Sequence, residues 1–491
     1  MCENLLRPSL CIRQLIAFGL KIKLRSKKAN GVIKVILTFV FFFFCLFAFG
    51  EERWQKLAEP KSLNPEAVIE EWPRFNGQNN DAKSKEYPIL LEWPSNGPSL
   101  IWTLSKGAGY ASPAIFGKQL VLFHRMEGRE IAECRDAQTG RGLWEYSYPV
   151  DYKDRYGYSA GPRASPVIFD GRVYLHGVTA WLTCLDLKTG KLLWKRDLRK
   201  EYQVPHYFFG KGSNPIVCDD GVILNVGGGN RQCIVNFDRK TGETIWVLKD
   251  DWGASYSSPI FATIHEQFVG LAMTGGESRP ATGGLLIFDP KTGKKLARFP
   301  WRSKRYESAT ACPPVALGEN YIFLSECYDK GSVLLHIKEN FSTEVVWENP
   351  SLGIHWMTPV ERNGILYGVS GRHQQGAEAF GLDWKKGHIL WKDRITWKQR
   401  INGRDLNLQL FRGSWLLVGN RFLCLSELGS LLNVRFSPDG WGIEQCSQLF
   451  FAPETWTLPA LSKGLLYVMQ NETDRMSGET SRLLCYDLRG S

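Results

Sequence analysis

The chain has 491 residues, of which 43% are apolar and 23% charged, and this composition excludes a disordered chain or a multi-span membrane protein. The formal net charge is +11, but much of the excess lies in residues 1–50, which contain eight Lys or Arg and one Glu. The rest of the chain has nearly balanced charge and no basic stripe that could follow phosphates, so a nucleic-acid partner is excluded.

The first predicted segment, residues 1–50, is a targeting or anchoring sequence. A basic head precedes an apolar run from Val35 to Gly50, which ends in the small-x-small pattern Ala48-Phe49-Gly50. As a helix the run would rise about 24 Å, slightly less than a hydrocarbon core of ~30 Å. It is therefore either a cleaved export signal or a short anchor in the inner membrane at residues 35–50, and a buried core segment is the remaining interpretation. The first two readings predict an exported, periplasmic or otherwise extracytoplasmic body.

Residues 51–98 are rich in Pro, Glu and Lys and show little periodicity. This composition predicts a linker that leads into the folded body and acts, up to about Asn96, as a spacer from the membrane. The folded body is predicted to occupy residues 99–491.

A repeated turn-and-strand unit fills the folded body. Its pattern is an Asp, then Thr-Gly three and four residues later, then a Trp eight residues after the Asp, as in Asp136, Thr139-Gly140 and Trp144. The Asp can accept hydrogen bonds from backbone N–H groups of the turn, and the Gly can take a positive φ. Eight copies are anchored at positions 136, 186, 238, 289, 339, 383, 426 and 487, between 43 and 61 residues apart. This spacing is about the length of four strands with their turns.

The Trp of each unit is predicted to dock against a small residue of the next unit and so to hold adjacent sheets together. The docking residues are Trp144, Trp194, Trp246, Trp347, Trp391 and, upstream of the first unit, Trp102. Ala297 replaces the Trp in the fourth unit. The residue two before the Asp is often Cys, as at Cys134 and Cys184, so most cysteines are predicted to be inert buried thiols at a repeated core position.

Each unit except the seventh opens with a Pro that can begin an innermost strand without losing a ladder hydrogen bond. The chain ends soon after a third strand at Asp487, and an unmatched strand precedes the first unit at Ser99–Leu104. We expect this strand, with Trp102, to complete the last unit. The prediction is an all-β fold, an eight-bladed β-propeller of four-stranded antiparallel blades, in which an N-terminal strand closes the last blade.

The repeated pattern resembles the tryptophan-docking motif of the PQQ-like (quinoprotein alcohol dehydrogenase-like) eight-bladed β-propellers, over about Trp72 to Ser491. Trp72-Pro-Arg-Phe-Asn-Gly77 is also similar to a segment that opens many exported members. The resemblance implies two functional classes: periplasmic dehydrogenases that use PQQ with Ca²⁺, and a non-enzymatic propeller lipoprotein of outer-membrane protein assembly. In the dehydrogenases a Trp and a disulfide of adjacent cysteines sandwich the quinone. This sequence contains no Cys-Cys pair, no calcium-loop spacing of acids and no CxxC metal motif, so no metal site is predicted.

Residues three before each strand-opening Pro are predicted to ring one mouth of the central channel. They are Tyr110, Arg163, Gly212, Tyr256, Ala311, Trp356 and Trp456, with Asp405 in the seventh place if the unit is aligned through Gly413. Four aromatic rings, one Arg and one Asp could hold a planar or anionic ligand by stacking and ion pairing. The loop Asp151–Tyr158 adds polar and aromatic groups at the same mouth. The alternative is that these rings only fill gaps between blades.

Two functions therefore remain open. The first is a non-catalytic, monomeric scaffold without a cofactor, which binds an envelope protein or peptide, or a small ligand, and meets the membrane only through its N-terminal segment. The second is a PQQ-dependent periplasmic dehydrogenase of alcohols or sugars, with Asp405 as base and Arg163 polarising the quinone carbonyl. The missing vicinal cysteines and calcium acids favour the scaffold.

Overall fold

The computed structural model describes residues 53–401 and 403–490. The predicted signal or anchor at residues 1–50 lies outside these described residues. The chain divides into two compact units, Met1–Arg53 and Trp54–Ser491, and the second contains every strand given below. Within the described part of the chain, no helix is long and apolar enough to cross a membrane.

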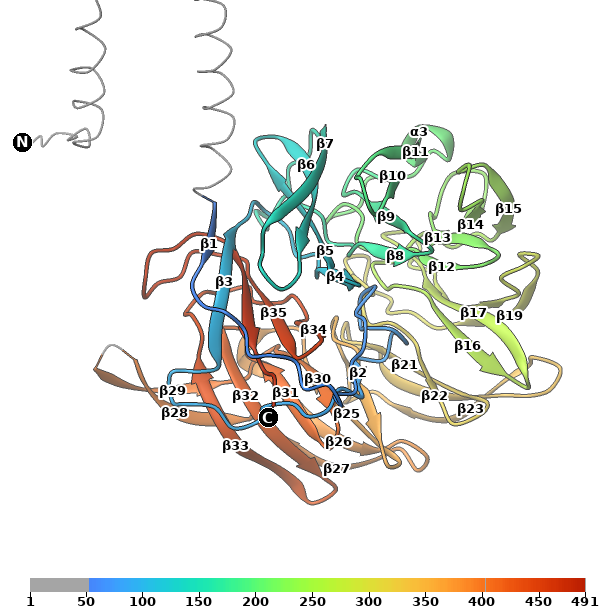
Figure 1. Cartoon of the computed structure of the whole chain (residues 1–491). Helices are drawn as coiled ribbons and strands as arrows, with labels where there is room; N and C mark the ends of the chain where they lie inside the picture. The colour runs from blue at the N-terminus through green and yellow to red at the C-terminus, as the bar shows by residue number, and fades with distance from the viewer. Residues whose placement is uncertain (1–52, 402, 491) are drawn as a thin grey trace, which may run out of the picture. The chain divides into compact units, whose positions relative to one another are not determined.

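Eight antiparallel four-stranded sheets form the blades of a β-propeller, as the repeat predicted (Figure 1). Blade 1 consists of β4 (Ala114–Phe116), β5 (Gln119–Met126), β6 (Arg129–Asp136) and β7 (Gly142–Pro149). Blade 2 consists of β8 (Val167–Phe169), β9 (Arg172–His176), β10 (Trp181–Asp186) and β11 (Leu192–Asp197). Blade 3 consists of β12 (Ile216–Cys218), β13 (Gly221–Asn225), β14 (Gln232–Phe237) and β15 (Thr244–Lys249). Blade 4 consists of β16 (Ile260–Ile264), β17 (Gln267–Thr274), β18 (Gly284–Phe288) and β19 (Lys295–Pro300).

The second half of the chain continues the same order, with one interruption. Blade 5 consists of β20 (Val315–Leu317), β21 (Tyr321–Glu326), β22 (Gly331–Ile337) and β23 (Thr343–Asn349). Blade 6 consists of β24 (Val360–Arg362), β25 (Ile365–Ser370), β26 (Glu378–Asp383) and β27 (His388–Asp393). A separate hairpin follows, of β28 (Thr396–Ile401) and β29 (Arg404–Gln409), before blade 7 with β30 (Ser414–Val418), β31 (Arg421–Leu425), β32 (Ser430–Ser437) and β33 (Gly440–Gln448). The short helices are α3 (Leu198–Glu201) and η1 (Gln374–Gly376).

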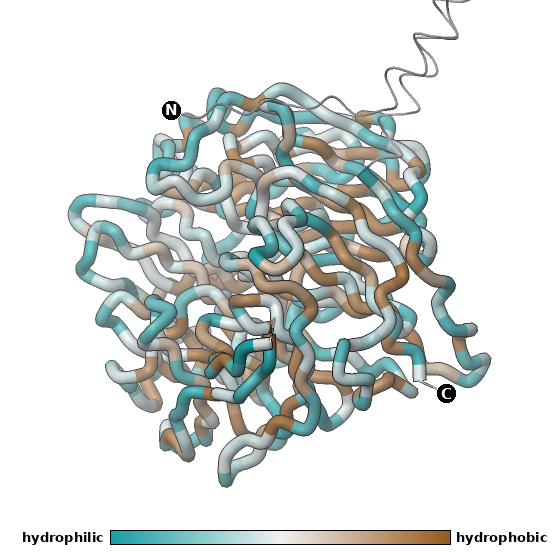
Figure 2. Tube along the Cα trace, turned by 90° about the vertical axis from the view of Figure 1, so that its left-hand side faces the viewer, coloured by the Kyte–Doolittle hydropathy of each residue, from teal (hydrophilic) through white to brown (hydrophobic). Residues whose placement is uncertain are grey.

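Blade 8 joins the two ends of the propeller sequence. It contains β34 (Ala460–Ser462), β35 (Leu465–Gln470), β36 (Arg482–Asp487) and, as its outer strand, β3 (Ser99–Ser105). Strands β3 and β36 pair antiparallel, with Trp102 opposite Cys485. A fifth strand, β1 (Trp54–Lys56), pairs with the outer side of β3. Figure 2 shows the hydrophobic residues gathered along the strands inside the body and the hydrophilic ones along its surface turns.

The predicted docking tryptophans connect six of the eight blade junctions among the described residues. Each indole N–H donates to a backbone carbonyl of the next blade. The pairs are Trp102–Ala137 (3.2 Å), Trp144–Leu187 (2.8 Å), Trp194–Arg239 (3.0 Å), Trp246–Pro290 (3.1 Å), Trp347–Trp384 (2.8 Å) and Trp391–Ser437 (2.9 Å). In five of these pairs the acceptor is the residue directly after the anchoring Asp of the turn.

The small residue beneath five of the six docked rings is the Gly of the next blade's turn, and Trp391 is the exception. A Cβ on Gly190 would lie 2.5 Å from Cε3 of Trp144, and the same close approach occurs at Gly140, Gly242, Gly293 and Gly387. The residue two before the Asp instead faces the Trp of its own blade, as in the pairs Cys134–Trp144 and Cys184–Trp194. Both thiols are buried, and burial raises their pKa to about 12, which fits the predicted inert role.

Two junctions lack a docking Trp and are bridged by other donors. Between blades 4 and 5, where Ala297 replaces Trp, the Nε2 atom of His265 lies 2.8 Å from the carbonyl oxygen of Ile337. Between blades 7 and 8, the backbone N–H of Leu90 donates to the carbonyl of Leu488, the residue after Asp487 (2.7 Å). At these two junctions the turn carbonyl therefore still accepts a hydrogen bond, although no indole donates it.

The anchor predicted at position 426 is wrong. Ser426 lies in the turn between β31 and β32, whereas the turn that receives Trp391 lies one strand later, between Ser437 and Gly440. Cys424 is buried on the second strand of its blade and does not occupy the repeated third-strand position. The docking turn of blade 7 lacks the Asp-x-x-Thr-Gly pattern. A weak resemblance to the motif in the preceding turn therefore led to the wrong position.

Residues 54–98 form part of the propeller rather than the predicted spacer. Trp72 is 1% exposed and exchanges backbone hydrogen bonds with Ile115 on the innermost strand of blade 1. Asn76 donates to Oγ1 of Thr358 at the start of blade 6 (2.7 Å), and β2 (Lys83–Ser84) pairs parallel with β30 of blade 7. The lead-in therefore fills the centre of the ring, as its course in Figure 1 shows.

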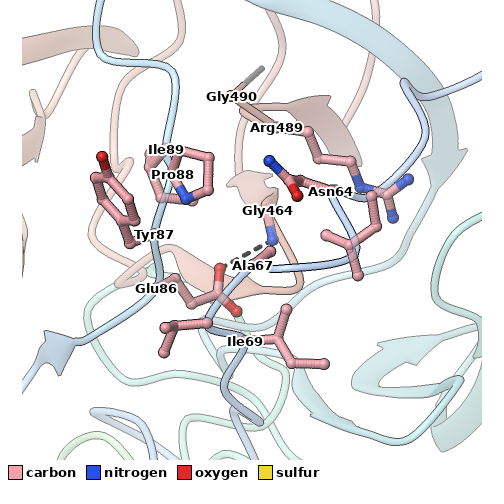
Figure 3. A pocket seen from close by; sticks show the side chains of 12 residues that line it. Asn64, Ala67, Ile69, Glu86, Tyr87, Pro88, Ile89, Gly464, Arg489 and Gly490 are labelled. Carbon is pink, nitrogen blue, oxygen red and sulfur yellow. Dashed lines mark hydrogen bonds between the residues drawn. The ribbon is translucent and has the colours of Figure 1, made fainter.

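A buried carboxylate fastens the lead-in to blade 8. Glu86 is 3% exposed and accepts hydrogen bonds from the backbone N–H of Gly464 (2.9 Å) and of Glu70 (3.0 Å) (Figure 3). Burial raises the pKa of Glu86. Gly464 follows the turn that joins the first and second strands of blade 8, so this contact lies at the end of the blades opposite the predicted mouth.

The docking turn provides a stability prediction with a matched control. Gly190 and Gly171 both have positive φ, +70° and +67°, but a Cβ on Gly171 would meet no atom within 4 Å. We expect Gly190→Ala to lower the free energy of unfolding by about 2–4 kcal/mol, because it adds overpacking against Trp144 to backbone strain. Gly171→Ala should lower the free energy of unfolding by about 1 kcal/mol, because it introduces only backbone strain. If the two variants lost equal free energy of unfolding in urea denaturation, the Trp144 ring would not be packed closely against the Gly190 turn.

Candidate functional site

The end of the propeller where the innermost strands begin carries a group of contacting aromatic rings. The ring of Trp456 lies 5.3 Å from that of Tyr110 and 5.2 Å from that of Trp356, measured between centroids. These three residues come from the starts of blades 8, 1 and 6. The structure therefore brings together three of the residues that the spacing placed at this mouth.

Arg163 joins the same group through Tyr110. Tyr256 joins it through Phe209, a residue that the sequence did not single out. The guanidinium of Arg163 lies 5.7 Å from the ring centroid of Tyr110 and 6.0 Å from that of Phe209. Phe209 in turn lies 5.6 Å from the ring of Tyr256. Phe209 belongs to the long connection between β11 of blade 2 and β12 of blade 3. Its only sequence signal is the neighbouring pair Phe208-Phe209 in a loop.

Asp405 does not belong to this group. It is exposed on β29 of the extra hairpin, where it pairs with Arg400 of β28. The alignment through Gly413 placed it wrongly, because the hairpin at residues 396–409 breaks the spacing between the strand and its preceding loop. Arg412 takes the seventh place, with its guanidinium 5.0 Å from the ring centroids of both Trp356 and Trp456. The Arg directly before Gly413 was the available signal.

We call this group the mouth cluster. It consists of Tyr110, Arg163, Phe209, Tyr256, Trp356, Arg412 and Trp456. Gly212, also predicted at the mouth, lies beside it, since a Cβ there would be 3.4 Å from Tyr256 and 3.5 Å from Arg163. The rings are half-buried and pack on one another, so they close this end of the channel as well as lining it.

Four carboxylates next to the mouth cluster are engaged by cluster residues. Arg163 forms an ion pair with Asp154 (2.7 Å), and Arg412 forms one with Glu427, which also accepts from the indole N–H of Trp456 (2.8 Å). The hydroxyl of Tyr256 donates to Glu277 (2.5 Å), and that of Tyr110 donates to Glu454.

Burial shifts the pKa of two of these acids and of both phenols. Burial raises the pKa of Glu454 and of Glu277, and it raises the pKa of Tyr110 and Tyr256 well above the ordinary value. The tyrosines are therefore neutral hydrogen-bond donors at pH 7. The mouth cluster offers flat rings and guanidinium groups, and four neighbouring acids are engaged by them.

A calcium-bound quinone would need a group of oxygen donors around the metal. No group of three His, Cys, Asp or Glu side chains within residues 53–401 and 403–490 is arranged to hold a metal ion. The lead-in occupies the centre of the ring, and the cavity between Arg74, Phe75 and the first strands of blades 2 to 4 has a volume of about 10 Å³. That volume accommodates about one water molecule.

The blade architecture and the docked indoles define the class of PQQ-like β-propellers. Residues 128–393, more than half of the chain, match the family model described as "Outer membrane protein assembly factor BamB". The chain therefore belongs to this family.

Two kinds of known protein are similar to the chain. The dehydrogenase subunit of a quinone-type alcohol dehydrogenase from Gluconobacter oxydans is 32% identical over 297 residues, 55% of this chain but only 37% of that subunit. The crystal structure of BamB from Moraxella catarrhalis matches 80% of this chain and 98% of its own, with a TM-score of 0.51 and 12% identity. The quinohemoprotein alcohol dehydrogenase of Comamonas testosteroni matches 86% and 81%, with a TM-score of 0.56 and 13% identity. The two structural matches show a shared fold.

Behind the mouth, His176 provides a pH-dependence prediction. It is 2% exposed, and its Nδ1 atom lies 2.9 Å from the carbonyl oxygen of Ser213. Burial, together with the nearby Lys211, lowers its pKa from 6.5 to about 4. The folded state thus binds fewer protons than the unfolded state between these values, so stability is fully present above pH 6.5 and falls as the pH drops towards 4.

The test compares the wild type with His176→Asn, whose amide can keep the donor to Ser213 but does not titrate. We expect the free energy of unfolding of the wild type to fall more steeply from pH 6.5 to 4 than that of the variant, by up to about 1.4 kcal/mol per pH unit. Urea titrations at several pH values measure the two slopes. Parallel slopes would mean that His176 is not held neutral in the fold.

Proposed function

We propose that the chain is an exported, non-catalytic propeller that binds a protein or peptide partner of the cell envelope at the mouth cluster. The observation that carries this proposal is the engagement of four neighbouring carboxylates by Arg, Tyr and Trp residues of the cluster, which leaves the aromatic rings as its contact surface. The cluster keeps aromatic edges for contact with a partner, and aromatic side chains are enriched at protein interfaces.

Exported location is supported by two observations. The basic head and the apolar run of residues 35–50 have the order of an export signal or inner-membrane anchor. The matching family model is described as an outer membrane protein assembly factor, which names an envelope role for that family. We propose that this chain acts in the same compartment, as a monomeric binding or assembly scaffold.

A quinone-dependent dehydrogenase of alcohols or sugars is the second candidate, favoured by the 32% identity to the Gluconobacter subunit. Two features weigh against it. Asp405, the acid named as its base, lies on the outer hairpin, and Arg163 is paired with Asp154 at 2.7 Å. A calcium-bound PQQ would also need the set of oxygen donors that the mouth cluster lacks.

Site-specific crosslinking tests the binding function. Tyr158 is 40% exposed and lies 5.6 Å from the ring of Trp456, at the edge of the mouth cluster. Leu143 is 51% exposed on the outer strand of blade 1 and serves as the control. We expect benzoylphenylalanine at position 158 of the full-length chain to give a discrete protein adduct in cells, and the same residue at 143 to give none. Equal adducts at both positions, or none at 158, would contradict the proposal.

A titration with PQQ tests the second candidate, the quinone-dependent dehydrogenase. The purified chain is mixed with PQQ and Ca²⁺, and bound quinone is measured by absorbance after gel filtration. The proposal predicts no stoichiometric retention and no dye reduction with alcohols or sugars. Stoichiometric retention with dye reduction would establish the dehydrogenase instead.

A further inference from the structure

A cleft opens beside the mouth cluster, between the loop that leaves blade 1 and the loop that leaves blade 2. Its volume is about 280 Å³. It is lined by Asp151, Tyr152, Lys153, Arg155, His206, Tyr207 and Phe208. Three of these seven residues are aromatic, two are cations (Lys153 and Arg155) and one is acidic. Burial lowers the pKa of the seventh, His206, so its ring is neutral at pH 7.

Two cations of the cleft lie at its surface. Lys153 and Arg155 are exposed, and neither forms an ion pair with any residue in the described part of the chain. The guanidinium of Arg155 lies 5.2 Å from the ring centroid of Phe208. Arginine stacked on an aromatic face keeps its N–H groups directed outwards and free for a carboxylate or phosphate.

A buried cation lies directly behind the aromatic wall. Lys211 is 6% exposed, and its Nζ atom lies 3.7 Å from the ring centroid of Tyr207 and has no hydrogen-bond acceptor. Burial lowers the pKa of Lys211 to about 7. Burial makes the ammonium form of Lys211 costly. The nearby carboxylate of Glu277 offsets part of that cost, and a further negative charge in the cleft would offset more.

The walls are held in place before any ligand arrives. The carbonyl of Tyr152 accepts from Nη1 of Arg125 (2.6 Å), and Asp154 accepts from the backbone N–H of Tyr156 (2.9 Å). On the facing loop, the backbone N–H of Phe208 donates to Glu277 (2.8 Å), and the hydroxyl of Tyr207 accepts from the N–H of Ala254 (3.0 Å). A rigid cleft loses little conformational freedom on binding.

We propose that this cleft binds a small organic anion, a carboxylate or phosphate ester carried on one flat ring. The ring would stack among Tyr152, Tyr207 and Phe208, and the anionic group would lie near Lys153 and Arg155. The volume is slightly below the ~300–1,000 Å³ of sites for drug-sized ligands, so it suits one ring with its substituent. The cleft is separate from the mouth cluster, and the inference does not depend on the proposed partner.

Isothermal titration calorimetry on the full-length chain at low salt tests the site with four probes: phenyl phosphate, benzoate, inorganic phosphate and benzyl alcohol. We expect phenyl phosphate or benzoate to bind at least tenfold more tightly than both inorganic phosphate and benzyl alcohol, because only these probes combine ring and charge. The tighter of the two identifies the anionic group. No heat from either aromatic anion up to 10 mM (about the limit of such measurements), or equal binding of benzyl alcohol, would overturn the proposal.

A charge-matched pair of variants localises the binding. Lys153→Gln/Arg155→Gln removes the two unpaired cations, and Lys188→Gln/Lys191→Gln removes two exposed cations from the turn at the opposite end of blade 2. We expect the first variant to raise the Kd of the tighter aromatic anion about tenfold and the second to leave it within about twofold. Both changes are at exposed positions, so thermal unfolding should be unaltered. Equal Kd values for the two variants would place the anion elsewhere. Failure of crosslinking at Tyr158 would leave this result unchanged.

Discussion

The propeller depends on one contact between neighbouring blades: an indole ring that lies on a glycine turn and donates its N–H to the carbonyl beside that turn. The contact needs three local features, an Asp to fix the turn, a Gly to let the ring approach, and a Trp on the outer strand of the preceding blade. Because each feature is specified within about a dozen residues, the motif can be repeated and still fit. The bridges made by His265 and by the N–H of Leu90 show that the acceptor site is retained where the ring is lost.

A ring of blades leaves a central channel, and this chain fills it from both ends. The lead-in between Trp72 and Ser84 passes along the innermost strands, and the mouth cluster closes the end where those strands begin. The channel is therefore part of the packed interior. Binding chemistry is left to the loops around the mouth, where rings and cations are only partly covered.

The parts of the fold that the sequence predicted are those made by local repetition. The blade number, the docking tryptophans and the pairing of the Trp102 strand with the last strand follow from short motifs. Of the nine described cysteines only Cys134, Cys184 and Cys485 occupy the repeated position opposite a Trp, so the prediction that most cysteines lie there is wrong. The lead-in was misread because its contacts with several different blades impose no period on its sequence. Asp405 was misplaced for the opposite reason, since a period was assumed across the hairpin at 396–409 that interrupts it. Phe209 comes from a loop, where packing partners leave no pattern in the sequence.

The central claim is that docked indoles hold the ring together, and the most direct measurement is the free energy of unfolding of Trp144→Phe beside that of Trp441→Phe. Both indoles donate a hydrogen bond, but Trp144 reaches the backbone of the next blade (2.8 Å), whereas Trp441 reaches the carboxylate of Asp393 at the surface (3.3 Å). We expect Trp144→Phe to lower the free energy of unfolding by about 2–3 kcal/mol and Trp441→Phe to lower it by less than about 1 kcal/mol. Losses of equal size would contradict the central claim.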